Sequence, residues 1–261
     1  MAKILIGPAG SGGAELKNFQ ELSDLGLDAV EIEFTYGVWM TKVQAQAIHE
    51  LNKKLGLKLS IHAPYFINLN SPEPQKLGAS RARILKCCEI AHYLGVKYVV
   101  FHSGFYLKST KEEAYTNIKE QILRIMREAK EKGWDDVALA PETTGKASQF
   151  GDLDENLQLI KDTGCSICID FAHLKARYNG KIDYDEIIDK IRASGLKKFH
   201  AHFSGIEYTS KGERKHLMTE EKDIKELFNH LKKLDAEISI INESPKPLDD
   251  AIKMKKLLEK L

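Results

Sequence analysis

The sequence predicts an α/β fold, a single (β/α)8 barrel that takes up residues 1–261 as one domain. Three observations predict it: short apolar runs alternate with helical stretches, a glycine usually precedes each run, and the alternation occurs eight times. Alternation of this kind is typical of parallel βα units. Eight units in a chain of this length favour a closed barrel over a doubly wound open sheet, which is the alternative.

The eight predicted strands lie in apolar, β-rich runs. Most runs begin with a glycine that follows a helical stretch, where the left-handed conformation costs glycine least. Between the runs, apolar residues recur at helical spacing, most clearly over 73–93, 115–129 and 219–234. The runs are KILIG at 3–7 and, with their flanking residues, 25–34, 55–64, 94–103, 132–142, 163–173, 194–205 and 234–245.

Composition restricts the class of protein only in part. The 39 basic and 38 acidic residues give a net charge of +1, which points to no particular partner. The N-terminal segment MAKILIGPAGSGG has too short an apolar run for a signal peptide, and no run approaches the roughly 20 residues of a membrane helix. The four cysteines do not resemble a disulfide framework, so we expect a cytoplasmic protein without membrane contact.

Ionisable side chains stand at the ends of six predicted strands. In (β/α)8 barrels the carboxyl ends of the strands form the active-site face. Burying so many such groups together is costly unless cations compensate, and imidazoles with carboxylates suit zinc, manganese or iron. Each residue alone would more often be structural or solvated, but their convergence predicts a multinuclear metal site. The residues are His62, His102, Glu142, Asp170 with His173 just after it, His202 and Glu243.

Other polar residues and cysteines of the predicted strands are weaker candidates for metal ligands. His200 lies two residues before the candidate ligand of its strand, so we expect it in the core or supporting that ligand. Glu31 and Glu33 end the second strand. Either one of them faces the barrel mouth, or the end of this strand is solvated. Cys165 and Cys168 would face opposite sides of a strand, which excludes their chelating one metal together and favours packing roles.

These motifs resemble those of endonuclease IV, a zinc-dependent family that cuts DNA at abasic sites. The resemblance runs from the second predicted strand to the eighth, and its most specific part is HAPYFINL at 62–69. The other matching motifs are FHS at 101–103, Glu142-Thr143, CIDFAH at 168–173, HFSG at 202–205, Lys215-His216 and NESP at 242–245.

The resemblance implies two or three bound Zn²⁺ ions, with Mn²⁺ or Fe²⁺ as alternatives. The implied ligands are His62, His102 and Glu142 for the first ion, Glu142, Asp170, His202 and Glu243 for the second, and His173 and His216 for the third.

One ligand position departs from the family pattern. The family has an aspartate two residues before the last histidine, and this chain has Arg214 there. A guanidinium cannot bind a metal ion and would repel one. Glu213 would take the role if the loop is shifted by one residue; otherwise the third site is weak, empty or completed by water.

The resemblance also implies contacts with damaged double-stranded DNA. Tyr65 and Phe66 resemble the family's wedge, which offsets the cost of flipping a nucleotide; packing over the rim is the alternative. The family's Arg-bearing loop after the second strand is different here, and its Tyr36 and Trp39 would stack on bases instead. Arg214 would contact a phosphate. Further basic residues near the rim loops that would meet phosphates are Lys108, Lys146, Lys175, Arg177, Lys211 and Lys215.

The implied activity is hydrolysis of the phosphodiester 5′ to an abasic site by a metal-activated water. Glu142 or Glu243 would orient that water, and we expect a monomer. A sugar isomerase or epimerase of the same superfamily is an alternative, with Glu142, Asp170, His202 and Glu243 around one ion. A catalytically silent DNA-binding paralogue is another. The number of bound metal ions separates the isomerase from the nuclease.

Overall fold

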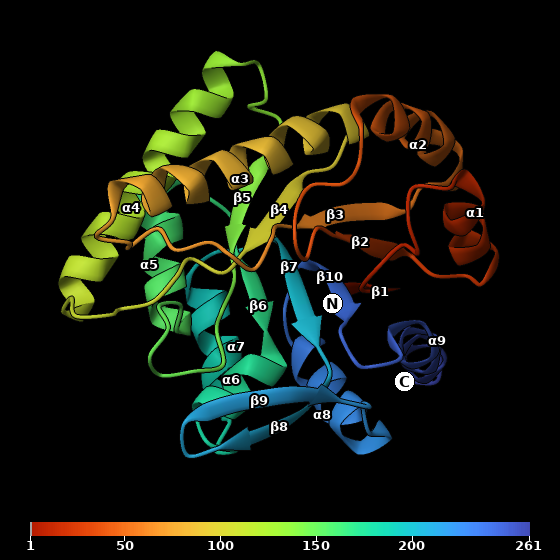
Figure 1. Cartoon of the computed structure of the whole chain (residues 1–261). Coiled ribbons are helices and arrows are strands. Elements are labelled where there is room, and N and C mark those ends of the chain that lie inside the picture. Colours follow the sequence, from red (N-terminus) through yellow and green to blue (C-terminus); the bar gives the residue numbers. More distant parts are fainter. Residues whose placement is uncertain (1) are drawn as a thin grey trace.

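The computed structural model describes residues 2–261, in which eight parallel strands form a barrel inside a ring of helices (Figure 1). The predicted fold class is confirmed, and each strand lies within a predicted run or one residue beyond it. The barrel strands are β1 (Lys3–Pro8), β2 (Ala29–Glu33), β3 (Lys58–His62), β4 (Tyr98–Phe101), β5 (Ala138–Pro141), β6 (Cys168–Asp170), β7 (Lys198–Phe203) and β10 (Glu237–Asn242).

The barrel consists of two sheets that meet at two edges, and we call these edges the seams. Four strands pair in the order β1-β10-β7-β6 and the other four in the order β2-β3-β4-β5. Single parallel bridges, Ala9 with Glu31 and Glu142 with Cys168, join the two sheets at both edges. The amide of Thr143 also donates to the Cys168 carbonyl at 3.0 Å. The doubly wound alternative is therefore excluded, and three ionisable residues lie on the seams themselves.

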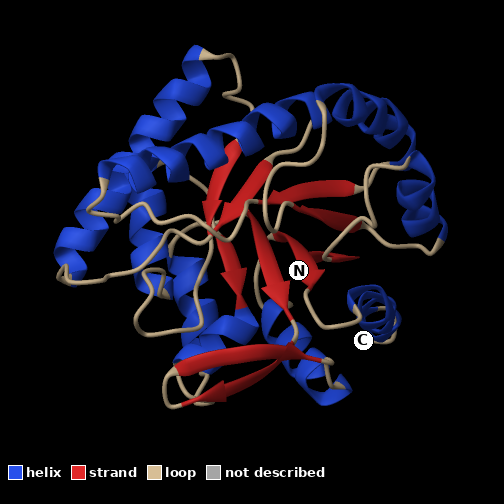
Figure 2. Cartoon of the chain, in the orientation of Figure 1, coloured by secondary structure: helices blue, strands red, loops and turns tan. Residues whose placement is uncertain are grey.

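Helices cover the outside of the barrel (Figure 2). Several have the start and stop signals expected from sequence: capping boxes begin α2, α4 and α5, and Gly56 and Gly95 end α2 and α3 in the left-handed conformation. The helices are α1 (Leu16–Asp24), α2 (Lys42–Leu55), α3 (Pro74–Leu94), α4 (Lys111–Glu131), α5 (Leu153–Thr163), α6 (Phe171–Arg177), α7 (Tyr184–Ala193), α8 (Glu221–Leu231) and α9 (Pro247–Leu258).

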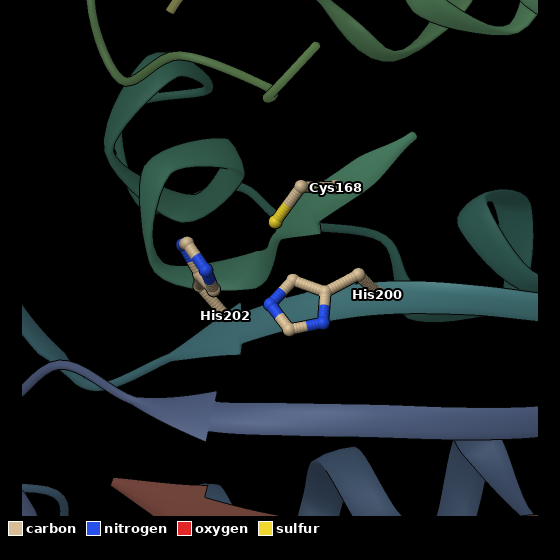
Figure 3. Close-up of side chains that lie close together, drawn as sticks. All are labelled: Cys168, His200 and His202. Atoms are coloured by element: carbon tan, nitrogen blue, oxygen red, sulfur yellow. The ribbon is translucent and has the colours of Figure 1, made fainter. Parts of the chain in front are cut away.

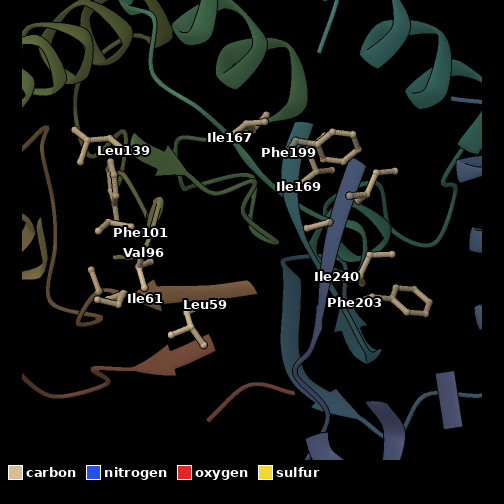
Figure 4. Packing of buried hydrophobic residues seen from close by; sticks show 14 of the residues in the cluster. Leu59, Ile61, Val96, Phe101, Leu139, Ile167, Ile169, Phe199, Phe203 and Ile240 are labelled. Atoms are coloured by element: carbon tan, nitrogen blue, oxygen red, sulfur yellow. The ribbon is translucent and has the colours of Figure 1, made fainter. Parts of the chain in front are cut away.

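The main hydrophobic core lies between the strands and the helices. Side chains alternate along a strand, so residues such as Ile61, Ile169 and Ile240 point outward into this layer (Figure 4). Their neighbours in sequence point into the barrel. Because the outward faces supply the apolar burial, the inward faces near the carboxyl ends are free to carry polar groups.

A two-stranded antiparallel hairpin follows β7, and the sequence patterns did not predict it. It consists of β8 (Gly205–Thr209) and β9 (Gly212–Leu217), and it stands apart from the barrel strands (Figure 1). Its strands are largely polar and half-exposed, so they lack the apolar runs by which the barrel strands were recognised.

All four cysteines are buried free thiols, as the sequence indicated. Among residues 2–261, no helix combines the length and the apolar character required to cross a membrane.

The seam between β1 and β2 predicts one sensitive position. A Cβ added at Gly7 would lie 1.8 Å from the carbonyl oxygen of Ala29. We expect Gly7→Ala to lower the free energy of unfolding by about 3 kcal/mol or more, because the backbones cannot separate without opening the barrel. Urea denaturation followed by circular dichroism measures this.

Gly37→Ala is the matched control, since a Cβ at Gly37 meets nothing within 4 Å. Equal unfolding midpoints for the two variants would contradict the role of Gly7 in closure.

Candidate metal centre

The strand-end residues predicted from sequence meet at the mouth of the barrel, around the carboxylate of Glu142. His62 Nε2 and His102 Nε2 lie 3.1 and 2.9 Å from Glu142 Oε2. His173 Nδ1 and His202 Nδ1 lie 3.1 and 3.3 Å from Oε1. Glu142 is fully buried, so these four imidazoles, rather than water, surround its charge.

Three adjoining groups of donor atoms at the mouth contain both imidazoles and carboxylates, and each is compact enough to hold a metal ion; a further group, Glu31, Glu33 and Glu243, contains carboxylates alone. Within each group the donor atoms lie within 4.8 Å of one another. Glu142 belongs to two groups, so it is placed to bridge them. The three groups with both donor types are His62, His102 and Glu142; then Glu142, Asp170, His202 and Glu243; then His173, Glu213 and His216.

Hydrogen bonds fix the orientation of three of the imidazoles. Nδ1 of His62 lies 2.8 Å from the Ala63 carbonyl, and Nδ1 of His173 lies 3.0 Å from the Thr143 carbonyl. Nδ1 of His216 lies 2.7 Å from Ser204 Oγ. Since a carbonyl only accepts, Nδ1 carries the proton in the first two, and Nε2 is the nitrogen left free for a ligand.

Two carboxylates are positioned by local structure. Asp170 caps α6: its Oδ1 accepts from the His173 amide at 2.7 Å, while its buried Oδ2 has no hydrogen-bond partner among the described residues. Glu243 follows Asn242, whose side chain donates to Thr219 Oγ1 at 2.9 Å. The Oδ1 atom of Asn242 accepts from the Ser244 amide. This pair of bonds holds the end of β10 at the rim.

Glu213 takes its place in the third group because β9 contains a bulge. Tyr208 pairs with Glu213 and Glu207 with Lys215, so Arg214 is an extra, unpaired residue. An extra residue reverses the alternation of side chains, which brings Glu213 to the same face as His216. Glu213 Oε2 lies 3.5 Å from His173 Nε2. The shift by one residue considered from the sequence is therefore the arrangement observed.

The hairpin is held against the loop after β5. The Glu213 amide donates to the Gly145 carbonyl at 3.0 Å. Arg177 supports that loop from α6 by donating to the carbonyls of Lys146 and Gln149 at 2.7 and 3.1 Å. The expectation that Arg177 meets phosphates is wrong, because its guanidinium is almost fully buried and occupied by these bonds.

Arg214 points away from the donor groups. Its side chain is exposed and pairs with Glu207 Oε1 at 2.8 Å, while Lys215 pairs with the other oxygen at 3.2 Å. The charge that would repel a metal ion thus lies on the opposite face of the hairpin.

Burial and mutual interaction shift the pKa values in the centre. Burial alone would raise the pKa of Glu142, but the charges of His102 and His202 and hydrogen bonds from the imidazoles lower it well below the usual value. Burial raises the pKa of Glu243 to about 7, as it does for Glu33. Burial opposes protonation of His62, but the nearby carboxylates raise its pKa to about 10. Without metal, the centre therefore holds protons at neutral pH.

Aromatic side chains surround the mouth. Tyr65, Phe66 and Tyr36 are 55, 61 and 82% exposed. Trp39 is 44% exposed; its ring packs edge-on against Phe34, and its Nε1 donates to the Glu33 carbonyl at 2.9 Å. Since large aromatic groups in water are costly, this arrangement is suited to a planar, apolar ligand group.

Sequence reasoning underestimated the polar layer beneath the mouth. Glu31 is fully buried and faces the barrel interior, so of the two alternatives left open for this strand, solvation is excluded for this residue. Its oxygens lie 2.8 Å from His200 Nε2 and 2.7 Å from His202 Nε2. The signal that could have identified it is the two-residue spacing in Glu31-Ile32-Glu33 and in His200-Ala201-His202, which places each pair on one strand face.

Comparison with known proteins agrees with the geometry. The chain is 38% identical to an uncharacterized protein of Methanocaldococcus jannaschii, over 99% of this chain and 98% of that protein. It is 31% identical to a probable endonuclease 4 of Mesomycoplasma hyopneumoniae, over 52% of this chain and 49% of the relative, so that match spans only about half of each.

The similarity to solved structures extends over the full length of this chain. Endonuclease IV of Thermus thermophilus superimposes with a TM-score of 0.73 at 25% identity, covering 100% of this chain and 99% of that one. A D-tagatose 3-epimerase-like protein superimposes with a TM-score of 0.74 at 22% identity over 99 and 96% of the two chains, which shows a shared fold. The family model described as xylose isomerase-like TIM barrel matches residues 19–261, and the chain belongs to that family.

Proposed function

We propose that this protein is a metal-dependent hydrolase that cuts the phosphodiester 5′ to abasic sites in double-stranded DNA. The observation that carries the proposal is the set of three adjoining His and carboxylate groups at one barrel mouth. An isomerase with a single ion would need only one of them. The relatives described as endonuclease 4 support the same choice. We further propose that the protein acts as a monomer in the cytoplasm.

The donor set fits zinc, with manganese or iron as alternatives, because imidazoles and carboxylates are borderline ligands for all three. We assign Glu142 as the bridge between the first two ions. Glu213 completes a third site with His173 and His216 in place of the missing aspartate. The full set of proposed ligands is His62, His102, Glu142, Asp170, His173, His202, Glu213, His216 and Glu243.

Bound ions of this kind lower the pKa of water and neutralise charge on phosphate oxygens. The residues of the chain supply position and proton transfer. Glu142 and Glu243 are the candidates for orienting the attacking water. Of the two, Glu243 is the more accessible, with a side chain 17% exposed against 1% for Glu142, so it is the better placed to receive a proton.

The exposed aromatic residues would hold the DNA. Tyr65 and Phe66 stand beside the centre, and the rings of His62 and Tyr65 lie 6.1 Å apart. Insertion of such groups at a lesion offsets the unstacking energy of a flipped nucleotide. Tyr36 and Trp39 extend this surface, and Arg214 would exchange Glu207 for a phosphate.

A sugar epimerase is the second candidate. The observation that favours it is that Glu142, Asp170, His202 and Glu243 form a complete four-donor group by themselves. It gives no role to His102, Glu213 and His216, whose donor atoms converge on separate groups. The number of ions bound at the mouth distinguishes the two functions.

The first test is cleavage of a duplex that carries a single abasic site. We expect incision by the zinc-loaded protein, and a loss of at least about 100-fold in His62→Ala because a ligand is removed. His92→Ala is the control, since His92 lies on α3 and pairs with Asp136 away from the mouth. Protein that carries two or more ions at the mouth yet leaves the duplex intact would overturn the proposal.

Glu213 and Arg214 give a second, paired test. Glu213→Gln removes a proposed ligand, so the metal content should fall by roughly one ion per chain. Arg214→Ala should leave the metal content unchanged but weaken DNA binding and reduce its dependence on salt. Metal analysis and binding titrations at several salt concentrations measure both. Metal loss in Arg214→Ala with none in Glu213→Gln would refute the assignment.

In the metal-free protein, the raised pKa values of His62 and Glu243 should make the free energy of unfolding depend on pH. His62 has a folded pKa of about 10 against 6.5 in the unfolded chain, so its stabilising effect is complete below about pH 6.5 and is lost as the pH rises. The pKa of Glu243 is raised to about 7 in the folded protein, so its contribution to stability also falls as the pH rises toward 7. The metal-free protein should therefore lose stability as the pH rises from about 6.5 to about 10.

Urea midpoints of the chelator-treated protein across this range test the prediction. His62→Gln should flatten the dependence, because it removes one of the groups that retain a proton in the folded state. A midpoint that rises with pH in the metal-free protein would contradict the prediction.

A further inference from the structure

A second group of donor atoms lies inside the barrel, beneath the mouth. Cys168 on β6 and His200 and His202 on β7 point toward one another (Figure 3), and their donor atoms lie within 4.8 Å. Glu31 on β2 reaches across the barrel to both imidazoles, at 2.8 and 2.7 Å. We call Cys168, His200, His202 and Glu31 the inner group. All four residues are at most 1% exposed.

The inner group is left unsatisfied by the protein. Both oxygens of Glu31, both ring nitrogens of His200 and Nε2 of His202 have no hydrogen-bond partner among the described residues. Four of these atoms contact one another, in the Glu31–imidazole ion pairs at 2.8 and 2.7 Å. Nδ1 of His200 lies outside these pairs, so the buried group retains donor capacity that the described residues do not fill.

His202 presents one ring nitrogen to the mouth and the other to the inner group. Nδ1 faces Glu142 and Glu243 at the mouth, at 3.3 and 3.4 Å, whereas Nε2 faces Glu31 at 2.7 Å. Because the two nitrogens point to different groups, a ligand in the inner group does not displace one at the mouth.

We propose that the inner group binds a divalent metal ion of the zinc class. Cys168, His200 and His202 supply three donors within 4.8 Å of one another, and Glu31, which contacts both imidazoles, is the candidate for the fourth donor of a closed zinc site. The thiol of Cys168 would lose its proton to solvent on binding. His202 would lose its ring proton as well and bridge this ion to the mouth. The proposal does not depend on the reaction assigned to the mouth.

A cavity approaches the inner group from the opposite end of the barrel. It has a volume of about 390 Å³ and reaches His200 from the amino ends of the strands. Its lining includes Ser60, Tyr98 and Ser239.

Cobalt loading tests the proposal with a signal that the mouth cannot produce. A Co²⁺–thiolate bond gives a charge-transfer band in the near ultraviolet, and none of the proposed mouth ligands is a cysteine. We expect this band in cobalt-loaded protein. Cys168→Ser should abolish it and lower the cobalt content by roughly one ion per chain. Cys165→Ser is the matched control and should keep both.

His200→Gln and Glu31→Gln provide variants that leave every cysteine in place. Each should shift or weaken the band and release the inner ion at a lower chelator concentration, roughly 10-fold or more. Absence of the band in the wild type, or its persistence in Cys168→Ser, would overturn the proposal. So would unchanged cobalt content and spectra in both His200→Gln and Glu31→Gln, because the inner group would then be a packing network only.

Discussion

A buried carboxylate requires positive charge around it, and the mouth of this barrel is arranged around that of Glu142. Four imidazoles have a nitrogen within 3.3 Å of its oxygens. Without them, the desolvation of the carboxylate would cost several kcal/mol. Glu142 also forms the bridge that joins β5 to β6 and so closes the barrel. Closure of the barrel and assembly of the centre therefore meet at the same residue. The strand-end donors converge there directly, whereas Glu213 and His216 reach the centre on the β8–β9 hairpin.

The hairpin after β7 shows how one extra residue changes the chemistry of a site. In a regular strand, Glu213 and His216 would face opposite sides, since they are three residues apart. The bulge at Arg214 brings them to one face and turns the guanidinium to the other. Close contact between Gly212 and the Gly145 carbonyl then seats the hairpin on the loop after β5. The departure from the family pattern at Arg214 and the carboxylate beside it are thus two aspects of one local distortion.

The fold and most of the mouth were predictable from sequence because both depend on short-range periodicity. Strand ends follow from apolar runs, and a closed barrel brings all strand ends to one rim, so His62 and Glu243 could be assigned to one site without knowledge of any contact. The bulge could not be predicted, because it depends on the docking of a polar hairpin onto a distant loop. The partners of Glu31 could not be predicted either, since they lie across the barrel and depend on its closure and tilt.

Beneath the mouth, the barrel interior is apolar on one side and polar on the other, and this difference affects the charges of the inner group. Residues two positions before the mouth ligands form the layer below, and on β4 and β5 these are Val100 and Ala140, which pack against Cys168. An apolar wall on one side lowers the local dielectric and strengthens every charge interaction on the other. In the metal-free protein, burial would raise the pKa of Glu31, but His202 and His200 lower it well below the usual value, so the carboxylate stays ionised. Glu31 contacts both imidazoles, so in the metal-free protein a proton on an imidazole supplies the positive charge beside it, and a bound metal ion would supply that charge instead. With a thiol and a second imidazole already facing the same point, a metal ion satisfies more of these atoms than a proton does.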